Sequence, residues 1–362
     1  MDPRIVGRLR CPVCAEPLTE AATGTARALR CPRRHSFDVA RQGYVDLLAG
    51  RAPHAGDTAE MVAARTDFLA AGHYDTVSAA LAAAALAALH DASAAGAPTP
   101  APQALCSAPT GATVTDSERC VCGCRAKGTQ AVSRPRPEPG GPDTPARPPA
   151  ARPPAAGPTE GAGPTCGTGV GAYPLVVDAG AGTGRHLAAV LAALPDAVGL
   201  ALDVSKPALR RAARAHPRAA AALADTWRRL PLADGSVAVL LDVFAPRNGA
   251  EFRRVLHPAG ALLVVTPAED HLAELVDALG LLKVDPDKAD RVAGSLAGHF
   301  DQAAESVLRA RLELTAGEVA ILVGMGPSAR HTDPAVLAAR IAALPEPVGV
   351  TLAVRLGVYR PR

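Results

Sequence analysis

The sequence predicts an α/β fold in which a doubly wound, Rossmann-like sheet is preceded by a small metal-binding module. From residue 175 to about 267, short apolar runs alternate with helix-like blocks, which is the rhythm of successive βα units. A glycine-rich turn at 180–184 follows the first of these apolar runs. Near the N-terminus, three cysteines and a histidine form two close pairs. These three observations predict two unlike parts in one chain.

The N-terminal residues are spaced for a tetrahedral zinc site. Two residues separate Cys11 from Cys14 and three separate Cys31 from His35, with sixteen residues between the pairs. Two such pairs on short turns can close around Zn²⁺ and leave no open position for a substrate. We therefore expect structural zinc in a module too short to build a core alone. The alternative is reduced thiols beside an ordinary surface histidine.

Composition sets limits on partners and on cellular location. The net charge of +3 does not by itself indicate nucleic acid, and the 362 residues suffice for two or more domains. No apolar run follows the N-terminal methionine, and no stretch reaches the roughly 20 apolar residues of a membrane span. We therefore expect no membrane partner and a cytoplasmic protein with reduced thiols.

Changes in composition divide the chain into four parts. Residues 1–54 form the zinc module, and residues 55–91 form a connector of two helices broken at Gly72, with Asp57 or Thr58 as the first cap. Residues 92–171 are rich in Pro, Ala and Gly, and they cannot bury enough apolar area to offset their ordering entropy. We expect a disordered insertion there, in which Cys120, Cys122 and Cys124 either bind metal or are incidental. Residues 172–362 form the α/β domain.

Regular elements are expected throughout the α/β domain. Buried apolar runs predict strands at 175–179, 198–203, 237–244 and 260–266. Helices are expected between them, at 184–194, 206–216 and 248–256. Further strands at 307–314, 318–324 and 349–358 would complete the sheet, some of them antiparallel.

The glycine turn lies between a buried strand and a helix, where α/β folds bind nucleotide cofactors. Gly180, Gly182 and Gly184 let the backbone approach a ligand closely and adopt positive φ. The loop alone is ambiguous, because dinucleotide-binding enzymes also place glycines after their first strand.

Two carboxylates favour S-adenosyl-L-methionine over a nicotinamide cofactor, and a third acidic position supports them; the first carboxylate discriminates better, because dinucleotide-binding enzymes share the second. Asp178 precedes the glycines, where it can organise the loop and face the methionine ammonium. Asp203 ends the next strand, where a carboxylate can accept from both ribose hydroxyls. Asp225 follows the third strand, where it can accept from the adenine amino group. Each could instead be a cap or turn residue, but together they predict a class I S-adenosylmethionine-dependent methyltransferase with an N-terminal zinc ribbon.

Taken together, these motifs resemble one family, the zinc-containing methyltransferases that modify guanine N1 in a hairpin loop of bacterial 23S ribosomal RNA. The resemblance rests on the zinc pattern with residues 35–48, on residues 57–74, on the glycine loop, and on residues 203–207, 244–248 and 266–272. Residues 244–248 and 325–328 are most similar to the Gram-positive branch, which is associated with resistance to tylosin-type macrolides. The resemblance implies a 23S rRNA hairpin as partner, and it also implies a homodimer.

The resemblance also implies roles for particular residues. The family binds S-adenosylmethionine through a tyrosine, the glycine loop and a histidine, which correspond here to Tyr74, to Gly182–Arg185 and to His271. From the residues alone, Tyr74 and His271 would be interpreted as structural. The zinc module would bind RNA through Arg33 and Arg34, which suit a phosphate backbone. A solvated arginine face is the alternative, because arginine is common throughout the chain.

Methylation of guanine N1 also requires removal of a proton, so a general base or a hydrogen-bonded path is expected. Asp242, near the end of the predicted fourth strand, is the candidate base. A carboxylate at the edge of the core is an equal alternative for Asp242. Asn248, or backbone carbonyls at 245–246, could hold the edge of the target base.

Two other functions stay open from the sequence. The chain could be a small-molecule methyltransferase with an accessory zinc ribbon, which activity on a short rRNA hairpin would distinguish. It could also be a non-catalytic RNA-binding protein with a methyltransferase-like fold. The complete glycine loop and Asp203 argue against a non-catalytic protein. Measured cofactor binding would exclude a protein that has lost its cofactor site altogether.

Overall fold

The structure is a computed structural model of the chain, and it describes residues 1–23, 26–48, 50, 56–94, 173–281, 288–325 and 333–362. These residues belong to one compact unit, made of Met1–Pro102 and Gly169–Arg362. The second unit, Gln103–Thr168, lies outside the described residues. The predicted insertion at 92–171, with its cysteine cluster, therefore falls almost entirely on residues that the structure does not describe.

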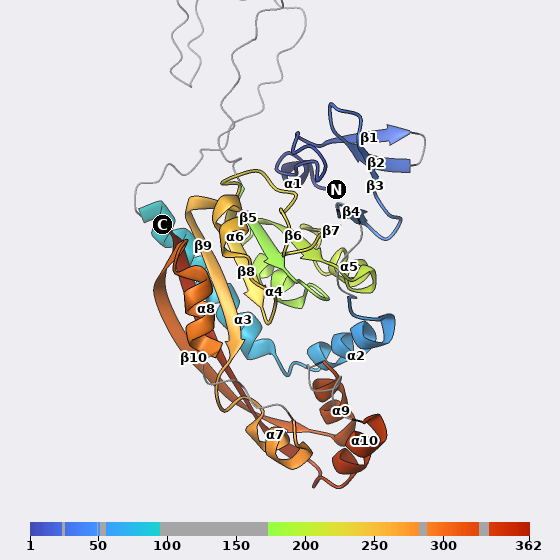
Figure 1. The fold of residues 1–362 in the computed structure, drawn as a ribbon, viewed down its shortest axis with the longest axis vertical. Coiled ribbons are helices and arrows are strands. Elements are labelled where there is room, and N and C mark those ends of the chain that lie inside the picture. The colour runs from blue at the N-terminus through green and yellow to red at the C-terminus, as the bar shows by residue number, and fades with distance from the viewer. Residues whose placement is uncertain (24–25, 49, 51–55, 95–172, 282–287, 326–332) are drawn as a thin grey trace, which may run out of the picture. The chain divides into compact units, whose positions relative to one another are not determined.

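An eight-stranded sheet forms the centre of the described unit (Figure 1), in the order β10-β11-β9-β8-β5-β6-β7-β4. Its strands are β4 (Tyr44–Asp46), β5 (Leu175–Ala179), β6 (Val198–Asp203), β7 (Ala219–Leu223), β8 (Val237–Val243), β9 (Leu256–Pro267), β10 (Phe300–Leu314) and β11 (Val348–Pro361). Strands β4 to β9 pair in parallel, whereas β11 is antiparallel to both of its neighbours. The strand order reverses between β5 and β8, which is the point where doubly wound sheets bind ligands.

Helices cover both faces of this sheet. One face carries α3 (Asp75–Ala94), α4 (Arg185–Ala193) and α5 (Lys206–Ala212), and the other carries α6 (Gly249–Val255) and α8 (Lys288–Leu296). Alternate residues of β5 enter different cores: Val176 belongs to the cluster that contains residues of α3 and α4, and Val177 belongs to the cluster that contains residues of α6 and α8. Both faces of the strand are therefore buried, which explains its unbroken apolar sequence.

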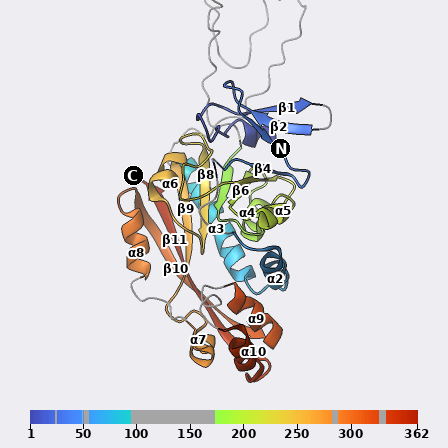
Figure 2. The same cartoon turned by 45° about the vertical axis from the view of Figure 1, so that its right-hand side comes forward.

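Four further helices lie beyond the carboxyl ends of the parallel strands (Figures 1 and 2). They are α2 (Ala59–Ala70), α7 (Ala273–Leu279), α9 (Ala316–Gly324) and α10 (Pro334–Ala342). Helix α9 contacts α2 and α10, and α10 also contacts α7. None of the helices that the structure describes has the length and apolar character of a membrane span.

The N-terminal module shares its core with the main sheet. It contains α1 (Pro3–Val6) and an antiparallel sheet of β1 (Thr19–Thr23), β2 (Ala26–Arg30) and β3 (Ser36–Asp38). The fully buried side chains of Ile5, Leu9 and Leu29 belong to the same apolar cluster as β5 and α6. The strand β4, just after the module, then pairs with β7 and lengthens the main sheet. Zinc binding should therefore stabilise more than the module itself.

Most of the predicted elements are confirmed. Strands β5 and β6 match their predicted bounds, β8 ends one residue early, and β9 begins earlier than predicted. The predictions at 307–314 and 349–358 fall within the antiparallel strands β10 and β11. The two helices of the connector are α2 and α3, and Thr58 caps α2 by accepting from the Met61 amide.

The strand predicted at 318–324 is wrong, because these residues form α9. Thr315 and Glu318 make a reciprocal capping box that satisfies amides at the start of the helix. The buried residues Val319, Leu322 and Val323 have the three- and four-residue spacing of a helix face, not the alternation of a strand.

Candidate functional site

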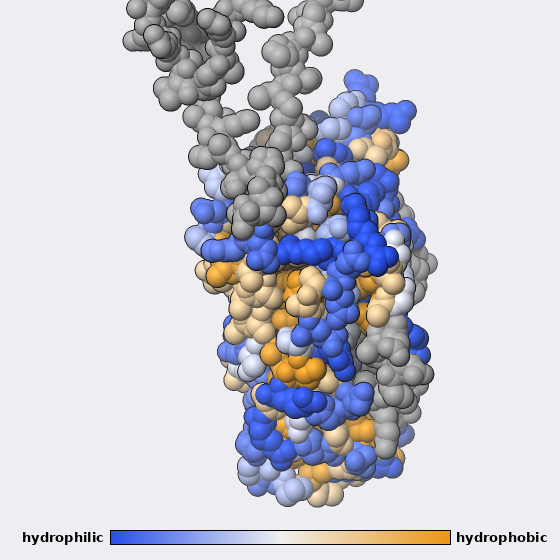
Figure 3. Space-filling model, turned by 90° about the vertical axis from the view of Figure 1, so that its left-hand side faces the viewer, coloured by the Kyte–Doolittle hydropathy of each residue, from blue (hydrophilic) through white to orange (hydrophobic). Residues whose placement is uncertain are grey.

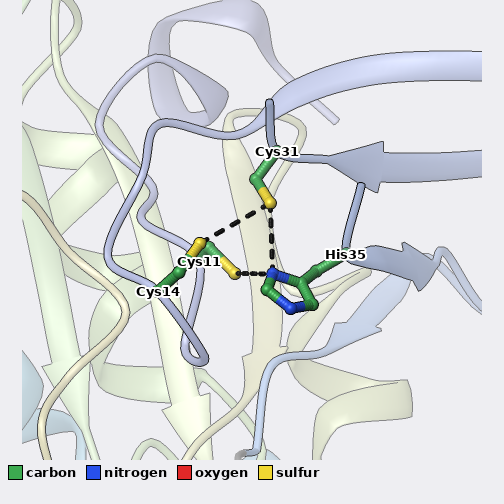
Figure 4. A group of neighbouring side chains, drawn as sticks. All are labelled: Cys11, Cys14, Cys31 and His35. Atoms are coloured by element: carbon green, nitrogen blue, oxygen red, sulfur yellow. Dashed lines mark hydrogen bonds between the residues drawn. The ribbon is translucent and has the colours of Figure 1, made fainter. Parts of the chain in front are cut away.

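The four predicted zinc ligands meet at one point in the N-terminal module (Figure 4). The Nδ1 atom of His35 lies 3.5 Å from the Cys11 Sγ and 3.3 Å from the Cys31 Sγ, and the Cys14 and Cys31 sulfurs are 3.7 Å apart. A tetrahedron with Zn–S bonds of about 2.3 Å and a Zn–N bond of about 2.0 Å has edges of roughly 3.5 to 3.8 Å. The three distances are close to the edges of this tetrahedron, and all four ligand atoms lie within 4.8 Å of one another, so the four side chains suit a zinc ion.

Two short turns bring the ligand pairs into place. The Ala15 amide donates to the Cys11 carbonyl at 2.8 Å, and the Arg34 amide donates to the Cys31 carbonyl at 2.9 Å. Arg34 itself has a φ of 68°, which lets the chain return toward the metal site at His35. Arg33 and Arg34 are both exposed beside this turn, as an RNA-contacting role requires.

A cavity of about 1210 Å³ lies at the carboxyl ends of the central strands. Helices α2 and α9 also line it, through Arg65 and Leu322 among others, and the Arg65 guanidinium lies beside Gly182 of the glycine loop. The structure brings most of the predicted cofactor-binding residues to its walls: Tyr74, Asp178, Gly180, Gly182, Arg185, Asp203, Asp225 and His271. Gly184 does not line the cavity, because it is the left-handed N-cap of α4 and lies against Ala212.

The glycine loop needs its glycines for two physical reasons. Gly180, Gly182 and Gly184 have φ values of 79°, 53° and 78°, which side chains rarely tolerate. A Cβ on Gly180 would also lie 2.6 Å from the Cβ of Ala245, in the loop after β8. The two loops on either side of the switch point are therefore in direct contact.

Asp203 fixes the glycine loop from the neighbouring strand. Its Oδ2 accepts from the Gly182 amide at 2.8 Å, and its Oδ1 accepts from the Ser205 amide at 2.8 Å. Burial raises the pKa of this carboxyl group, and the two amide donors oppose that shift. Each oxygen keeps a second lone pair, so hydroxyl donors from a ribose remain compatible with these bonds.

Asp178 is almost completely buried behind the loop. Its Oδ1 has no hydrogen-bond partner among the described residues. Burial, and then the nearby charge of Asp203, raise the pKa of Asp178 to about 7. A buried acceptor of this kind is stabilised by a cationic donor, which the ammonium group of S-adenosylmethionine would supply.

Asp225 offers a second buried acceptor on the same cavity. Its Oδ1 accepts from the Trp227 amide at 3.0 Å, whereas its Oδ2 has no hydrogen-bond partner among the described residues. The Nε of Arg228 lies 3.6 Å from that Oδ2. The acceptor suits an adenine amino group, and with Asp178 it indicates that the cavity fits S-adenosylmethionine.

Of the other predicted cofactor-binding residues, Tyr74 and His271 belong to an aromatic cluster, and Arg185 lies at the start of a helix. Tyr74 and His271 are joined through Phe244, whose ring centroid is 6.1 Å from each of theirs. Burial raises the pKa of Tyr74, which keeps its hydroxyl neutral. Arg185, in the first turn of α4, donates to Asp75 at 2.6 Å and so ties α4 to α3. No sequence signal assigned a role to Phe244, although it lies in a motif on which the family resemblance rests.

Asp242, the predicted base, is fully buried and does not line the cavity. Its Oδ1 accepts from Arg247 at 3.1 Å, and Arg247 does line the cavity. Burial raises the pKa of Asp242 well above its ordinary value, against the effect of Arg247. Its role as base stays a prediction, with Arg247 as its connection to the cavity.

Asn248, the alternative contact to the target base, already bonds within the protein. Its amide nitrogen donates to the Thr226 and Trp227 carbonyls, each at 3.3 Å, and its oxygen accepts from the Glu251 amide at 3.3 Å. Asn248 therefore connects the loop after β8 to the loop after β7.

The fold and the site together define a class I S-adenosylmethionine-dependent methyltransferase with a structural zinc ribbon. A family model described as "RlmA, N-terminal", a zinc ribbon, matches residues 9–52. A Micromonospora griseorubida protein, "Putative 23S rRNA (guanine-N(1)-)-methyltransferase", is 58% identical over the full length of both chains. A Streptomyces fradiae protein, "23S rRNA (guanine(748)-N(1))-methyltransferase", is 43% identical over 100% of this chain and 99% of its own. The chain therefore belongs to the family of 23S rRNA (guanine-N1)-methyltransferases.

Solved structures overlap less of the chain. The crystal structure of MccD protein is 14% identical, covers 52% of this chain and 90% of its own, and superposes with a TM-score of 0.36.

Replacement of His35 by alanine should abolish zinc binding and destabilise the main sheet, because the module and the sheet share a core. Far-ultraviolet circular dichroism during urea unfolding reports this effect, because the main sheet and its helices dominate that signal. We expect a loss of several kcal/mol, as about 10 kcal/mol or more of zinc-binding energy is coupled to folding. His90→Ala, at an exposed position, is the matched control and should keep its zinc. Full zinc content in His35→Ala would contradict the ligand assignment.

Asp178→Asn should stabilise the cofactor-free protein at pH 8 but not at pH 4. The pKa of about 7 exceeds the ordinary value of 3.8, so the folded state favours the protonated acid and loses stability as pH rises between these values. Asparagine removes this penalty, which is at most about 4 kcal/mol, and it should also weaken S-adenosylmethionine binding. Urea unfolding at both pH values measures the difference, with the exposed Asp196→Asn as control. An equal change in unfolding free energy at both pH values would contradict the raised pKa of Asp178.

Proposed function

We propose that the protein transfers a methyl group from S-adenosylmethionine to N1 of a guanine in a hairpin loop of 23S ribosomal RNA. The observation that carries this proposal is the full-length match to relatives named for this reaction. The Streptomyces fradiae relative is named for guanine 748, and we propose the equivalent nucleotide as the target here. We propose that the protein acts in the bacterial cytoplasm, where such a substrate is found.

In this proposal the chain's own residues orient the reactants. S-adenosylmethionine supplies an electrophilic methyl group on a sulfonium centre. The carboxylates of Asp178 and Asp225, each with one oxygen that has no hydrogen-bond partner among the described residues, hold the two ends of the cofactor through its ammonium and its adenine amino group. Asp203 accepts from the ribose while it holds the glycine loop, and Tyr74 and His271 cover the bound molecule. The work of the site is therefore mainly positioning.

The proton on guanine N1 must leave for the reaction to finish. Asp242 is the proposed acceptor, and Arg247 links it to the cavity. A raised pKa makes Asp242 a stronger base than an ordinary carboxylate once it is ionised.

We also propose a homodimer. Strand β10 is the outermost strand of the main sheet, and its residues from Asp301 to Val307 are exposed. Figure 3 faces the β10 side of the molecule and shows apolar side chains gathered between hydrophilic ones. An edge strand that pairs with only one other described strand, and that carries Val307 at 37% exposure, favours pairing with a second copy. Light scattering of the purified protein would give the mass of a dimer.

The test of the function is methyl transfer from labelled S-adenosylmethionine to protein-free 23S rRNA, with the site mapped by primer-extension arrest. We expect one new stop at a guanine in a hairpin loop. If the protein binds the cofactor but transfers no label to the RNA, the small-molecule methyltransferase is favoured instead. If the RNA is methylated, expression in a susceptible bacterium should raise its resistance to tylosin-type macrolides, as the family resemblance implies.

Asp242→Asn should reduce methyl transfer strongly and leave cofactor affinity within about twofold, because the side chain does not line the cavity. In the wild type, ionisation of Asp242 requires a pH above the ordinary range of a carboxyl group, so the single-turnover rate should rise with pH. The variant should lose this rise. An unchanged rate and pH profile would eliminate Asp242 as the base.

Arg33→Glu combined with Arg34→Glu should weaken rRNA binding by about tenfold or more and lower the slope of log K against log salt by about 2. Cofactor affinity should not change, because these residues lie on the zinc module. Arg210→Glu with Arg211→Glu makes the same charge change on α5, where both arginines are exposed. If this control weakens rRNA binding equally, Arg33 and Arg34 act only through the net charge of the protein.

A further inference from the structure

Two exposed aromatic side chains lie on the cofactor cavity. Aromatic residues make up only 3% of this chain, and most of those described are at least partly buried. Trp227 and Phe244, however, are 55% and 45% exposed, and both line the cavity. Large aromatic faces lose favourable burial when they are left in water, so their position beside a binding site requires an explanation.

The backbone of Phe244 is held in an unfavourable conformation. Its φ of 53° lies in the left-handed region, which a phenylalanine rarely adopts. Its amide donates to the Val265 carbonyl of β9 at 3.1 Å, and this bond fixes the turn at the end of β8. Strain of this kind persists where the surrounding structure imposes it, and it is concentrated at functional sites. Here it coincides with a side chain that faces the cavity rather than the core.

The Phe244 ring is oriented by its neighbours. The ring of His271 is inclined to it by 29° in a stacked arrangement, and the ring of Tyr74 meets it edge-on at 78°. Both neighbours are proposed to cover the cofactor. Phe244 therefore belongs to the same wall of the cavity as the residues expected around the methyl donor.

The loop that carries Phe244 also packs against the glycine loop. Ala245, the next residue, fills the space that a Cβ on Gly180 would need. Asn248 then bonds to the carbonyls of Thr226 and Trp227 in the adjoining loop. The two exposed aromatic side chains are thus carried by loops that hydrogen bonds hold together at one edge of the sheet.

We infer that Phe244 is the surface on which the target guanine stacks during methyl transfer. A base taken out of an RNA hairpin loses its stacking partners, and an aromatic ring beside the methyl donor restores that contact. This inference rests on the proposed function, because it names a guanine in RNA as the occupant. It adds a substrate-binding residue that contacts the base, not the cofactor.

The test compares Phe244→Leu with Phe244→Tyr in the full chain. Leucine keeps the apolar volume and shares the penalty for positive φ, so it removes the aromatic face and little else. Methyl transfer to the rRNA hairpin is measured as kcat and KM, and S-adenosylhomocysteine affinity is measured by calorimetry. We expect kcat/KM to fall by about tenfold to a hundredfold in the leucine variant, as for a lost base–aromatic stack. The tyrosine variant should keep most of the activity.

Two controls keep this result specific. S-adenosylhomocysteine affinity of Phe244→Leu should stay within twofold of wild type, which also shows that the variant is folded. Tyr173→Leu removes an exposed aromatic ring that does not line the cavity, and it should transfer methyl groups normally.

Three outcomes would overturn the inference, and they differ from one another. Wild-type kcat/KM in Phe244→Leu would mean that no base stacks on this ring. A matching loss of S-adenosylhomocysteine affinity would mean that the ring serves the cofactor. A wild-type protein that binds S-adenosylhomocysteine but does not methylate or bind the hairpin would overturn the proposed function, and the stacking inference with it. In the first two outcomes the proposed function survives.

Discussion

The cofactor end of this molecule depends on one partly buried carboxylate. Asp203 ends β6 and accepts hydrogen bonds from the amides of Gly182 and Ser205, one on each oxygen. The first bond holds the glycine turn after β5, and the second holds the residue that caps α5. A buried carboxylate is costly unless such donors surround it. The same residue therefore fixes the loop that would hold the cofactor and the helix that follows.

The zinc site, near the N-terminus of the chain, supports the same sheet. Its ligands fold the N-terminal module, and the apolar residues of that module pack into the core beneath β5 and β6. Strand β4 then joins the sheet beside β7. Because zinc, module and sheet share one core, the arginines proposed to contact RNA are carried by an element that is fixed to the catalytic domain. A flexible tether would not position a target base in this way.

The sequence predicts those parts of the structure that have local signals. Strands β5 and β6 are apolar runs bounded by turn residues, and the zinc ligands and glycine loop are recognised by their spacing. The helix α9 was predicted as a strand because a short apolar run has no decisive period. Its capping residues, Thr315 and Glu318, were the signal that would have corrected this.

The site was predicted less completely because burial and backbone conformation depend on tertiary contacts. Asp242 was recognised as a carboxylate at a strand end, but its contact with Arg247 and its distance from the cavity wall require the fold. Phe244 was identified only as part of a motif, since neither its exposure nor its positive φ can be seen in the sequence.

Calorimetric titration of S-adenosylhomocysteine into the wild type and into Asp203→Asn tests the central role of this carboxylate most directly. Asparagine keeps the shape of aspartate but has one acceptor oxygen, so it cannot accept from both amides. We expect the wild type to bind. The variant, shown to be folded by its circular dichroism, should bind at least about tenfold more weakly, a difference of about 1.4 kcal/mol. Equal affinity in a folded variant would contradict the account.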